Sequence, residues 1–557
     1  MSARMKQVAV LILAFSMVLL ALSACGGGSG TSSDSPDASG QPAGGGSDLA
    51  AQIAQEALDY SAQVDSERKA GATSSKDSLV FAAVVDPGRI SLDNLLDFTQ
   101  YPFATSCVEY FIRWDFEAGK YYSPVCDSYE VDADGQGVTF HITPGIKMHD
   151  GETFESSDLL TSIFAFRNDA GLGWQLDFID LDASKAIDEY TCYLKFTFPN
   201  GVWEVSLEMM TLISGKSYTP GDESFYQKPV GPAAYRVTEW VPGDHITVTA
   251  FEDYYRGAPP IKTQTMRIIS DRTSAFMALQ NGEIDLLWNI SADQVATAYQ
   301  SDDLKLVMTG QNMMIYMGMN AGNEALADFR VRQAIYLAAN RDDIVRGAYD
   351  GLAFPANSIL TVESIGYNED YDTNSPFPAR DVERAKALME EAGYGDGLTL
   401  RVLAESTINF QLVVEQLSAQ LGEIGITLEP ELTDYASVSA KIFSGDTTAY
   451  DLYMQVVEDC ADSIATIDNP MLFGASHPEL SSDGSGDTYR EICDSIRSTG
   501  DLAKRTQLYL DLQEFFFDKG LYWLPLAASQ TYVGIDKDLT GLRFNGFLVY
   551  FEESYFR

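Results

Sequence analysis

The sequence predicts an α/β fold, and three observations lead to this prediction. Residues 138–142 alternate apolar with polar side chains, which is the period of a half-buried strand. Residues 328–345 and 383–394 carry apolar side chains at helical spacing. Between residues 398 and 430 a strand, a helix and a second strand follow one another, an order typical of βαβ units and of a largely parallel sheet.

The first strand belongs to the segment 140–160, FHITPGIKMHDGETFESSDLL. Its Pro-Gly pair at 144–145 presets a turn, because proline fixes φ and glycine accepts a positive φ. We expect a second short strand over 146–148, closed by the Asp-Gly pair at 150–151. The polar side chains at 156–158 then offer N-cap oxygens to a helix.

The later elements follow from the same signals. Val331, Ile335 and Ala338 form the apolar stripe of one helix, and Asn340 can end it. In the helix over 383–394, Gly393 supplies the stop signal. The βαβ unit consists of a strand at Leu398–Leu403, a helix at Phe410–Ile424 and a strand at Ile426–Pro430.

The strong acidity of the chain restricts its partners. Its 557 residues are enough for about two or three domain-sized units. Asp and Glu outnumber Lys and Arg by 81 to 37, for a formal charge of −44. This balance argues against nucleic acid, which needs a basic footprint, and against adsorption on an anionic membrane by surface charge. We interpret the excess as a solvated acidic surface.

The N-terminus carries signals for export and anchoring. Arg4 and Lys6 precede an apolar run, Val8–Leu22, which is shorter than the ~20 residues of a spanning helix and fits the apolar part of a signal peptide. The following LSAC stretch resembles a bacterial lipobox, in which the cysteine is lipidated and becomes the mature N-terminus. We therefore predict a lipoprotein signal peptide over 1–25 and a lipid anchor on Cys25. The alternative is an ordinary signal peptide with an incidental cysteine.

Two further segments precede the main folded region. Residues 26–47 contain no large apolar side chain and cannot bury enough surface to fold, so we expect a flexible tether. Residues 48–76 begin with an amphipathic helix, over 48–70. Its apolar side chains recur at helical spacing: Leu49, Ile53, Ala57, Tyr60 and Val64. We interpret it as a stalk or as a helix packed on the folded region, and a partner-docking role is the alternative.

Motifs for catalysis and metal binding are absent from the sequence. It has no G-x-S-x-G, no G-x-x-x-x-G-K and no H-E-x-x-H, so we predict no enzyme activity and no cofactor. No metal site is predicted from the four histidines, which we interpret as structural or surface residues: His141, His149, His245 and His477. Five cysteines follow Cys25, an odd number that leaves a free thiol or an intermolecular bond. Cys107 with Cys126 is one candidate bridge.

The segment 140–160 also closely resembles the signature of a transport family, the family 5 extracellular solute-binding proteins of ABC transporters. These bind oligopeptides, dipeptides and sometimes nickel or other small solutes. The shared pattern is roughly F-x-L-R-x-G-V-K-F-H-D-G-x-P-F-T-A-x-D-V, and Glu155 stands where a threonine cap is favoured. The matching residues are Phe140, Gly145, Ile146, Lys147, His149, Asp150, Gly151, Phe154 and Asp158. Further resemblances lie at 230–255, 275–286, 328–345, 351–356 and 522–526.

This resemblance implies a two-lobed, periplasmic-binding-protein-like fold of type II, in the large peptide-binding class, with an extra subdomain in lobe I. Two α/β lobes would be joined by a pair of crossing strands. Carried over to this chain, lobe I covers 77–312 and 525–557, and lobe II covers 313–524. The crossings are then expected near Met314–Met319 and Leu521–Leu526.

The best candidate for a ligand site lies in the stretch 450–473. Tyr450–Val457 is interpreted as a buried strand, and three acidic residues cluster after its carboxyl end, where ligands sit in open α/β sheets: Glu458, Asp459 and Asp462. In the peptide-binding members of the family, an Asp of this loop pairs with the α-ammonium of the peptide. The resemblance implies Asp459 or Asp462 for that role, since a buried cation needs a compensating carboxylate.

An aromatic residue expected beside this loop is missing. Many family members carry a Trp just before the loop, where this chain has Gln-Val-Val at 455–457. Four other tryptophans could supply stacking, although each is more typical of a core: Trp114, Trp174, Trp240 and Trp288. We include Trp288 in the predicted ligand site.

The predicted function is that of a lipid-anchored, monomeric substrate-binding subunit of an ABC importer. It would capture peptides on the outer face of the cytoplasmic membrane and deliver them to permease and ATPase subunits. Two alternatives remain open. One is the same fold with a non-peptide solute such as a nickel chelate, haem, a sugar or an opine, and the other is a surface receptor or sensor without transport.

Overall fold

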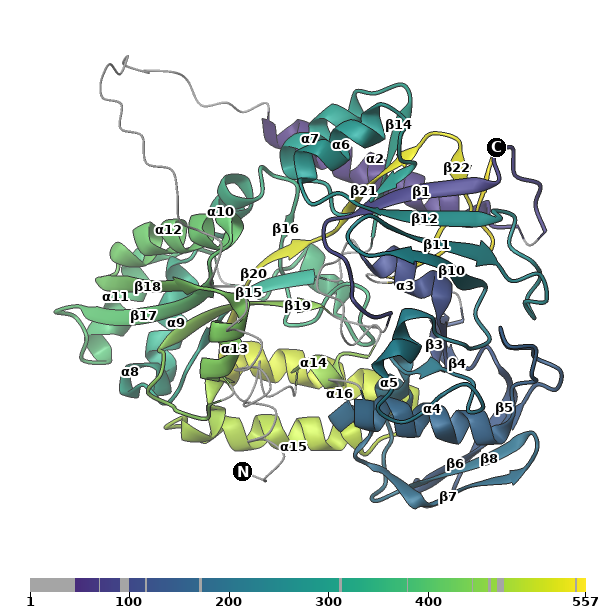
Figure 1. Cartoon of the computed structure of the whole chain (residues 1–557). Coiled ribbons are helices and arrows are strands. Elements are labelled where there is room, and N and C mark those ends of the chain that lie inside the picture. Colours follow the sequence, from purple (N-terminus) through teal and green to yellow (C-terminus); the bar gives the residue numbers. More distant parts are fainter. Residues whose placement is uncertain are drawn as a thin grey trace, which may run out of the picture.

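Two α/β lobes, each built on one mixed sheet, make up the computed structural model of the chain (Figure 1). The structure describes residues 46–69, 71–90, 100–115, 118–169, 173–309, 313–377, 379–442, 444–458, 462–467, 475–545 and 548–557. The sheet of lobe I has seven strands and that of lobe II has six. The predicted α/β fold with two lobes is confirmed.

The sheet of lobe I has a parallel centre. β1 (Ser78–Ala83) runs parallel to β12 (Thr263–Ile268) on one side and to β13 (Leu286–Leu287) on the other. Leu79, Phe81 and Ala83 of β1 are buried, as expected for a central strand covered on both faces. The other strands of this sheet are β10 (Tyr235–Val241), β11 (His245–Ala250), β21 (Tyr532–Asp536) and β14 (Leu304–Met308).

The sheet of lobe II contains the predicted βαβ unit. β17 (Leu398–Glu405), α12 (Ile408–Gly422) and β18 (Ile426–Thr433) follow one another, and the two strands pair in parallel along their whole length. β19 (Leu452–Glu458) lies parallel to β17 on its other side. The sheet is completed by antiparallel strands: β15 (Met313–Met319), β20 (Trp523–Ser529) and β16 (Phe354–Pro355).

The predicted helical segments of lobe II are present. Residues 328–345 form two helices, α9 (Phe329–Ala338) and α10 (Arg341–Ala348). Asn340 lies between them and caps the second, because its side chain accepts a hydrogen bond from the backbone N–H of Asp343. The third helix is α11 (Val382–Glu391), and Gly393 follows its end with a φ of 91°.

The chain crosses between the lobes at two places. β14 of lobe I is followed by β15 of lobe II, so the first crossing lies between Met308 and Met313. β20 pairs with β15 up to Ser529 before the chain enters β21. The second crossing therefore lies after Ser529, and the boundary expected between residues 524 and 525 falls inside β20. The stretch Met314–Met319, expected near a crossing, lies within β15.

The segment 140–160 builds an extra subdomain next to lobe I. Its strand is β6 (Gly137–Ile142), whose Phe140 is buried against Phe111 and Trp203 at ring distances of 4.8 and 5.5 Å. The expected strand over 146–148 is reduced to a single bridge between Lys147 and Thr153. The helix that follows is α4 (Ser156–Asp169). The small sheet also contains β5 (Cys126–Val131), β7 (Ile179–Asp188) and β8 (Thr191–Phe196).

The predicted N-terminal helix is α2 (Gly46–Ser66), and it packs on lobe I. Ile53, Ala54 and Ala57 are buried in one cluster with Met308 of the edge strand β14. The hydroxyl of Ser61 accepts a hydrogen bond of 2.6 Å from the backbone N–H of Met308. The helix thus covers the outer edge of the sheet just before the first crossing. The predicted signal peptide, Cys25 and nearly all of the tether lie outside the described residues.

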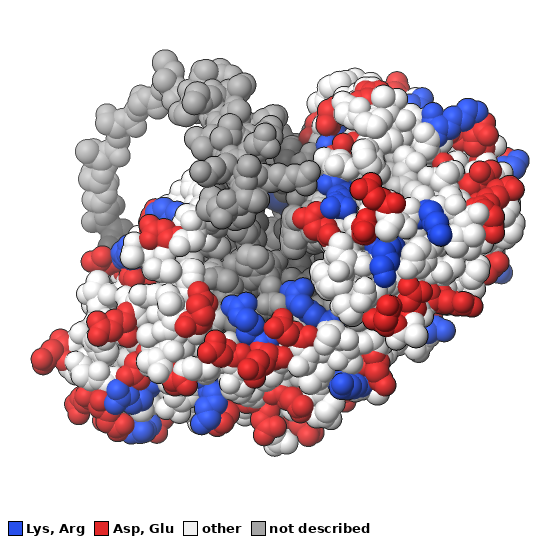
Figure 2. Space-filling model, turned by 90° about the horizontal axis from the view of Figure 1, so that it is seen from below, with Lys and Arg blue, Asp and Glu red and all other residues white. Residues whose placement is uncertain are grey.

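On the face that Figure 2 presents, charged side chains are scattered rather than gathered in one patch. Figure 2 shows acidic residues over both lobes on the face that it presents, with fewer basic residues between them. This distribution agrees with a solvated acidic surface. In the part of the chain that the structure describes, no helix combines the length and the apolar character needed to cross a membrane.

The hydrogen bond between α2 and β14 leads to a first prediction. Ser61→Ala should lower the free energy of unfolding by about 1–3 kcal/mol, because the buried N–H of Met308 would lose its acceptor. Ser66→Ala, on an exposed position of the same helix, is the matched control and should change it by less than about 0.5 kcal/mol. Urea unfolding checks both, and equal effects of the two substitutions would contradict the packing of α2.

Candidate ligand-binding cleft

The carboxyl ends of the parallel strands in both lobes point toward the crossing segments. In lobe II, Glu458 at the end of β19 lies opposite Met313, the first residue of β15. In lobe I, Leu287 at the end of β13 pairs with Gly534, in the middle of β21. Ligands of open α/β sheets bind outside the carboxyl ends of the strands. The space between these two edges is therefore the expected ligand site.

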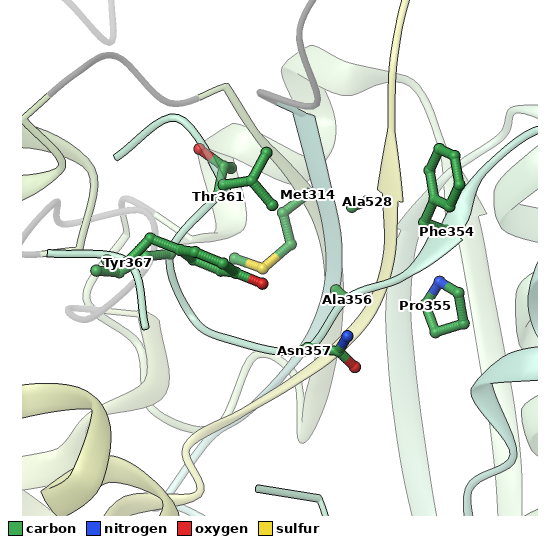
Figure 3. A pocket seen from close by; sticks show the side chains of 10 residues that line it. Met314, Phe354, Pro355, Ala356, Asn357, Thr361, Tyr367 and Ala528 are labelled. Atoms are coloured by element: carbon green, nitrogen blue, oxygen red, sulfur yellow. The ribbon is translucent and has the colours of Figure 1, made fainter. Parts of the chain in front are cut away.

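A pocket of about 470 Å³ lies at this edge of lobe II (Figure 3). Met314 and Tyr367 point toward each other across it, and Asn357 lies at its lower end in this view. The pocket combines apolar walls with a few polar groups, the usual composition of a small-molecule site. It is lined by Met314, Phe354, Pro355, Ala356, Asn357, Leu360, Thr361, Val362, Tyr367 and Ala528.

The predicted acidic loop follows β19, and of its three acidic residues the structure describes only the side chain of Asp462. Asp459 lies outside the described residues, and only the backbone of Glu458 is described. Asp462 is fully buried, with Oδ2 at 2.8 Å from Nε of Arg505 on α16 (Leu502–Phe515). The hydroxyl of Tyr509 donates a hydrogen bond to the other oxygen of this carboxylate, Oδ1. Burial raises the pKa of Asp462, although Arg505 opposes the shift. This side chain is occupied with holding the loop on lobe II.

Two of the four candidate tryptophans, Trp288 and Trp114, lie in hydrophobic cores. Trp288 is 1% exposed and stacks on Phe544 at a ring distance of 6.4 Å, inside the core of lobe I. Trp114 is buried against Tyr121, and Nε1 of Trp240 donates to Asp86 at 3.4 Å. The side chain of Trp174 is not described. The aromatic side chains at the pocket are Phe354, on the short strand β16, and Tyr367, on the segment that follows it; neither belongs to a periodic pattern.

The two lobes also meet away from the crossings. The backbone N–H of Gly201, in the extra subdomain, donates to the carbonyl of Arg497 at the end of α15 (Ser485–Arg497) at 2.9 Å. Nη1 of Arg505 donates to the carbonyl of Gly201 at 2.6 Å and to that of Thr499 at 3.0 Å. A Cβ at Gly201 would lie 2.4 Å from the carbonyl carbon of Thr499. Only glycine fits this contact, which holds the lobes together on the side of α5 (Trp203–Glu208).

Comparison with known proteins identifies the family. Residues 120–468 match the family model described as "Bacterial extracellular solute-binding proteins, family 5 Middle". The chain belongs to this family. The matched residues run from the extra subdomain through most of lobe II. The resemblance found in the segment 140–160 is thereby confirmed.

Individual relatives are similar over most of their length. The glutathione-binding protein GsiB of Pectobacterium atrosepticum is 26% identical over 430 residues, 75% of this chain and 82% of the relative. The dipeptide-binding protein of Escherichia coli is 24% identical over 453 residues, with the same coverage. Among solved structures, the ABC transporter substrate-binding protein CtaP of Listeria monocytogenes superposes with a TM-score of 0.73 at 20% identity, covering 88% of this chain and 100% of that one.

The cysteines and histidines of this family 5 protein have structural surroundings. Cys107, Cys126 and Cys192 are free thiols, so the candidate bridge between Cys107 and Cys126 is not formed. Nε2 of His149 lies 2.9 Å from the carbonyl oxygen of Ala233. Among the described residues, no group of three His, Cys, Asp or Glu side chains is placed to hold a metal ion.

The contact at Gly201 leads to a second prediction. Gly201→Ala should separate the lobes, because the added Cβ would overlap the backbone of Thr499. Small-angle X-ray scattering should then give a larger radius of gyration than for the unsubstituted protein. Gly422→Ala is the matched control, since its Cβ would meet nothing within 4 Å. A radius that is the same in both variants would show that the contact does not hold the lobes.

Proposed function

We propose that this family 5 protein is the solute-binding lipoprotein of an ABC importer and that it captures peptides between its two lobes. The observation that carries the proposal is the arrangement of two sheets whose strand ends face one another across two crossings, with a pocket at that edge. Two relatives with glutathione and dipeptide ligands in their names support peptides as the solute class.

A peptide suits the groups around this edge. Asn357, Thr361 and Tyr367 supply hydrogen-bonding side chains for backbone amides, and Met314 and Phe354 supply apolar walls. We assign the α-ammonium to the acidic loop, with Asp459 and Glu458 as its counter-charges. Asp462 supports this loop through its ion pair with Arg505, which is why we assign it a positioning role.

Capture is proposed to work by closure of the lobes. A peptide that contacts both lobes stabilises the closed arrangement, because the open arrangement offers only half of the contacts. The contact of Gly201 with Arg497 and Arg505 would form in that closed arrangement. The closed protein would then dock on the membrane permease, and other subunits would hydrolyse ATP. The lipid on Cys25 would keep this monomer on the outer face of the cytoplasmic membrane.

A third prediction tests the ammonium assignment. Trialanine with a free amino terminus should raise the melting temperature of the purified full-length protein, and N-acetyl-trialanine should not, because acetylation removes the charge that the acidic loop compensates. Asp459→Asn should abolish the difference between the two peptides. Equal stabilisation by both peptides would exclude the ammonium assignment, and no stabilisation by either would contradict peptides as the solute class.

A further inference from the structure

Two carboxylates lie one turn apart on the short helix α5, which begins two residues after the lobe contact at Gly201. Glu204 and Glu208 are spaced i, i+4 and therefore share one face of the helix. Glu208 is only 9% exposed. Within the part of the chain that the structure describes, its carboxyl group makes no hydrogen bond and no ion pair.

The groups that face these carboxylates come from both lobes. Glu208 lies within electrostatic range of Asp462 in lobe II and of Tyr550 on β24 (Leu548–Tyr550) in lobe I. Glu204 lies within range of Asp462 and of Arg505. Arg505 is the one cation among these neighbours, and it already pairs with Asp462 and donates to two backbone carbonyls. Glu204 and Asp462 thus share one guanidinium, which does not reach Glu208.

A second cluster of buried carboxylates, in which each carboxylate is paired with a guanidinium group, provides a comparison. Glu109 pairs with Arg113, and Glu552 lies 3.1 Å from Arg113 and 3.0 Å from Arg256. Two carboxylates there meet two guanidinium groups, so the charges balance. The face of α5 is different because it lacks such compensation. Burial raises the pKa of Glu204 to about 7 and that of Glu208 to about 8, and the charge of Asp462 adds to both shifts.

We propose that Glu208, together with Glu204, forms a cation-binding subsite on the lobe I side of the cleft, which takes an ammonium or guanidinium group of the solute. A basic side chain of a peptide carries such a group. The inference rests on the proposed function, which supplies the ligand cleft. An organic cation fits better than a metal ion, because the described residues hold no group of three metal-ligating side chains.

Binding of a cationic solute at this subsite would favour closure of the two lobes. Without a cation, burial and the charge of Asp462 in lobe II raise the pKa of Glu208 to about 8 and so favour its protonated form at pH 7. A cation beside Glu208 favours the ionised form and attracts the carboxylates of both lobes. It acts in addition to the ammonium site of the acidic loop, so a peptide with a basic side chain would use both.

Matched peptides test the subsite. Gly-Lys-Gly and Gly-norleucine-Gly both keep the free amino terminus and differ only in the side-chain charge. By calorimetry at pH 7, the unsubstituted protein should bind the lysine peptide at least about 10-fold more tightly. Glu208→Gln should reduce this preference to less than about 2-fold, since it keeps the shape and removes the charge. Glu189→Gln, at an exposed position in the turn between β7 and β8, is the control and should leave the preference unchanged.

A second readout separates a ligand contact from a merely structural effect. Binding of the lysine peptide should release protons from the unsubstituted protein at pH 7, because the cation favours ionised Glu208, and the norleucine peptide should release none. Calorimetry in phosphate and in Tris buffer measures this difference. At pH 5 the unliganded protein and Glu208→Gln should melt at the same temperature, since the carboxyl group is then protonated.

The outcomes distinguish the subsite from the proposed function. Equal affinity of the unsubstituted protein for both peptides, or a preference that survives in Glu208→Gln, would overturn the subsite while peptide binding stands. Binding of agmatine that depends on Glu208, with no binding of either peptide, would support the subsite and contradict peptide capture. No binding of the two peptides or of agmatine would overturn both.

Discussion

The pair of crossing segments between the lobes is the constraint on which the rest of the structure depends. In lobe I the sheet ends at Met308 opposite Tyr532, and in lobe II the next sheet begins at Met313 opposite Ser529. Between them Thr309 and Thr531 bond to each other, with N–H to carbonyl at 3.1 Å and N–H to hydroxyl at 3.2 Å. The crossings are therefore held side by side, and both sheets must direct the carboxyl ends of their parallel strands toward them. A rotation of the lobes can be confined to these few residues while each sheet keeps its hydrogen bonds.

Charge pairing divides these buried carboxylates into two groups. Asp462 and Glu552 are paired with guanidinium groups and hold backbone segments in place. Breaking such a pair typically costs about 3–5 kcal/mol, because the remaining partner is left buried and uncompensated. Glu208 has no such partner among the described residues, and its burial agrees with the proposed subsite for a cation of the solute. The same distinction explains why the strong acidity of the chain says little about its ligand, since most acidic side chains are solvated.

Local signals in the sequence were sufficient to predict helices and strands but not the tertiary contacts between them. The strand, helix and strand between 398 and 433 and the segment 140–160 were predictable, because periodicity, glycine turns and caps act within a few residues. The position of the second crossing was not predictable from local signals, since Trp523–Ser529 is a continuous apolar strand and nothing within it shows which sheet it joins. The contact of Gly201 with Arg505 joins residues that are 304 positions apart, and no local pattern marks it. For the same reason the pairing of Asp462 and the lack of a partner at Glu208 appeared only in the fold.

The most direct test of this account is a distance between the lobes with and without a peptide. Spin labels at Asp302→Cys in lobe I and Asp396→Cys in lobe II, both at exposed positions, allow it to be measured by pulsed electron paramagnetic resonance. If the crossings act as the hinge of a peptide-binding cleft, Gly-Lys-Gly will move the distance distribution to shorter values and narrow it. A distribution that the peptide leaves unchanged at saturating concentration would contradict closure of the lobes around a solute.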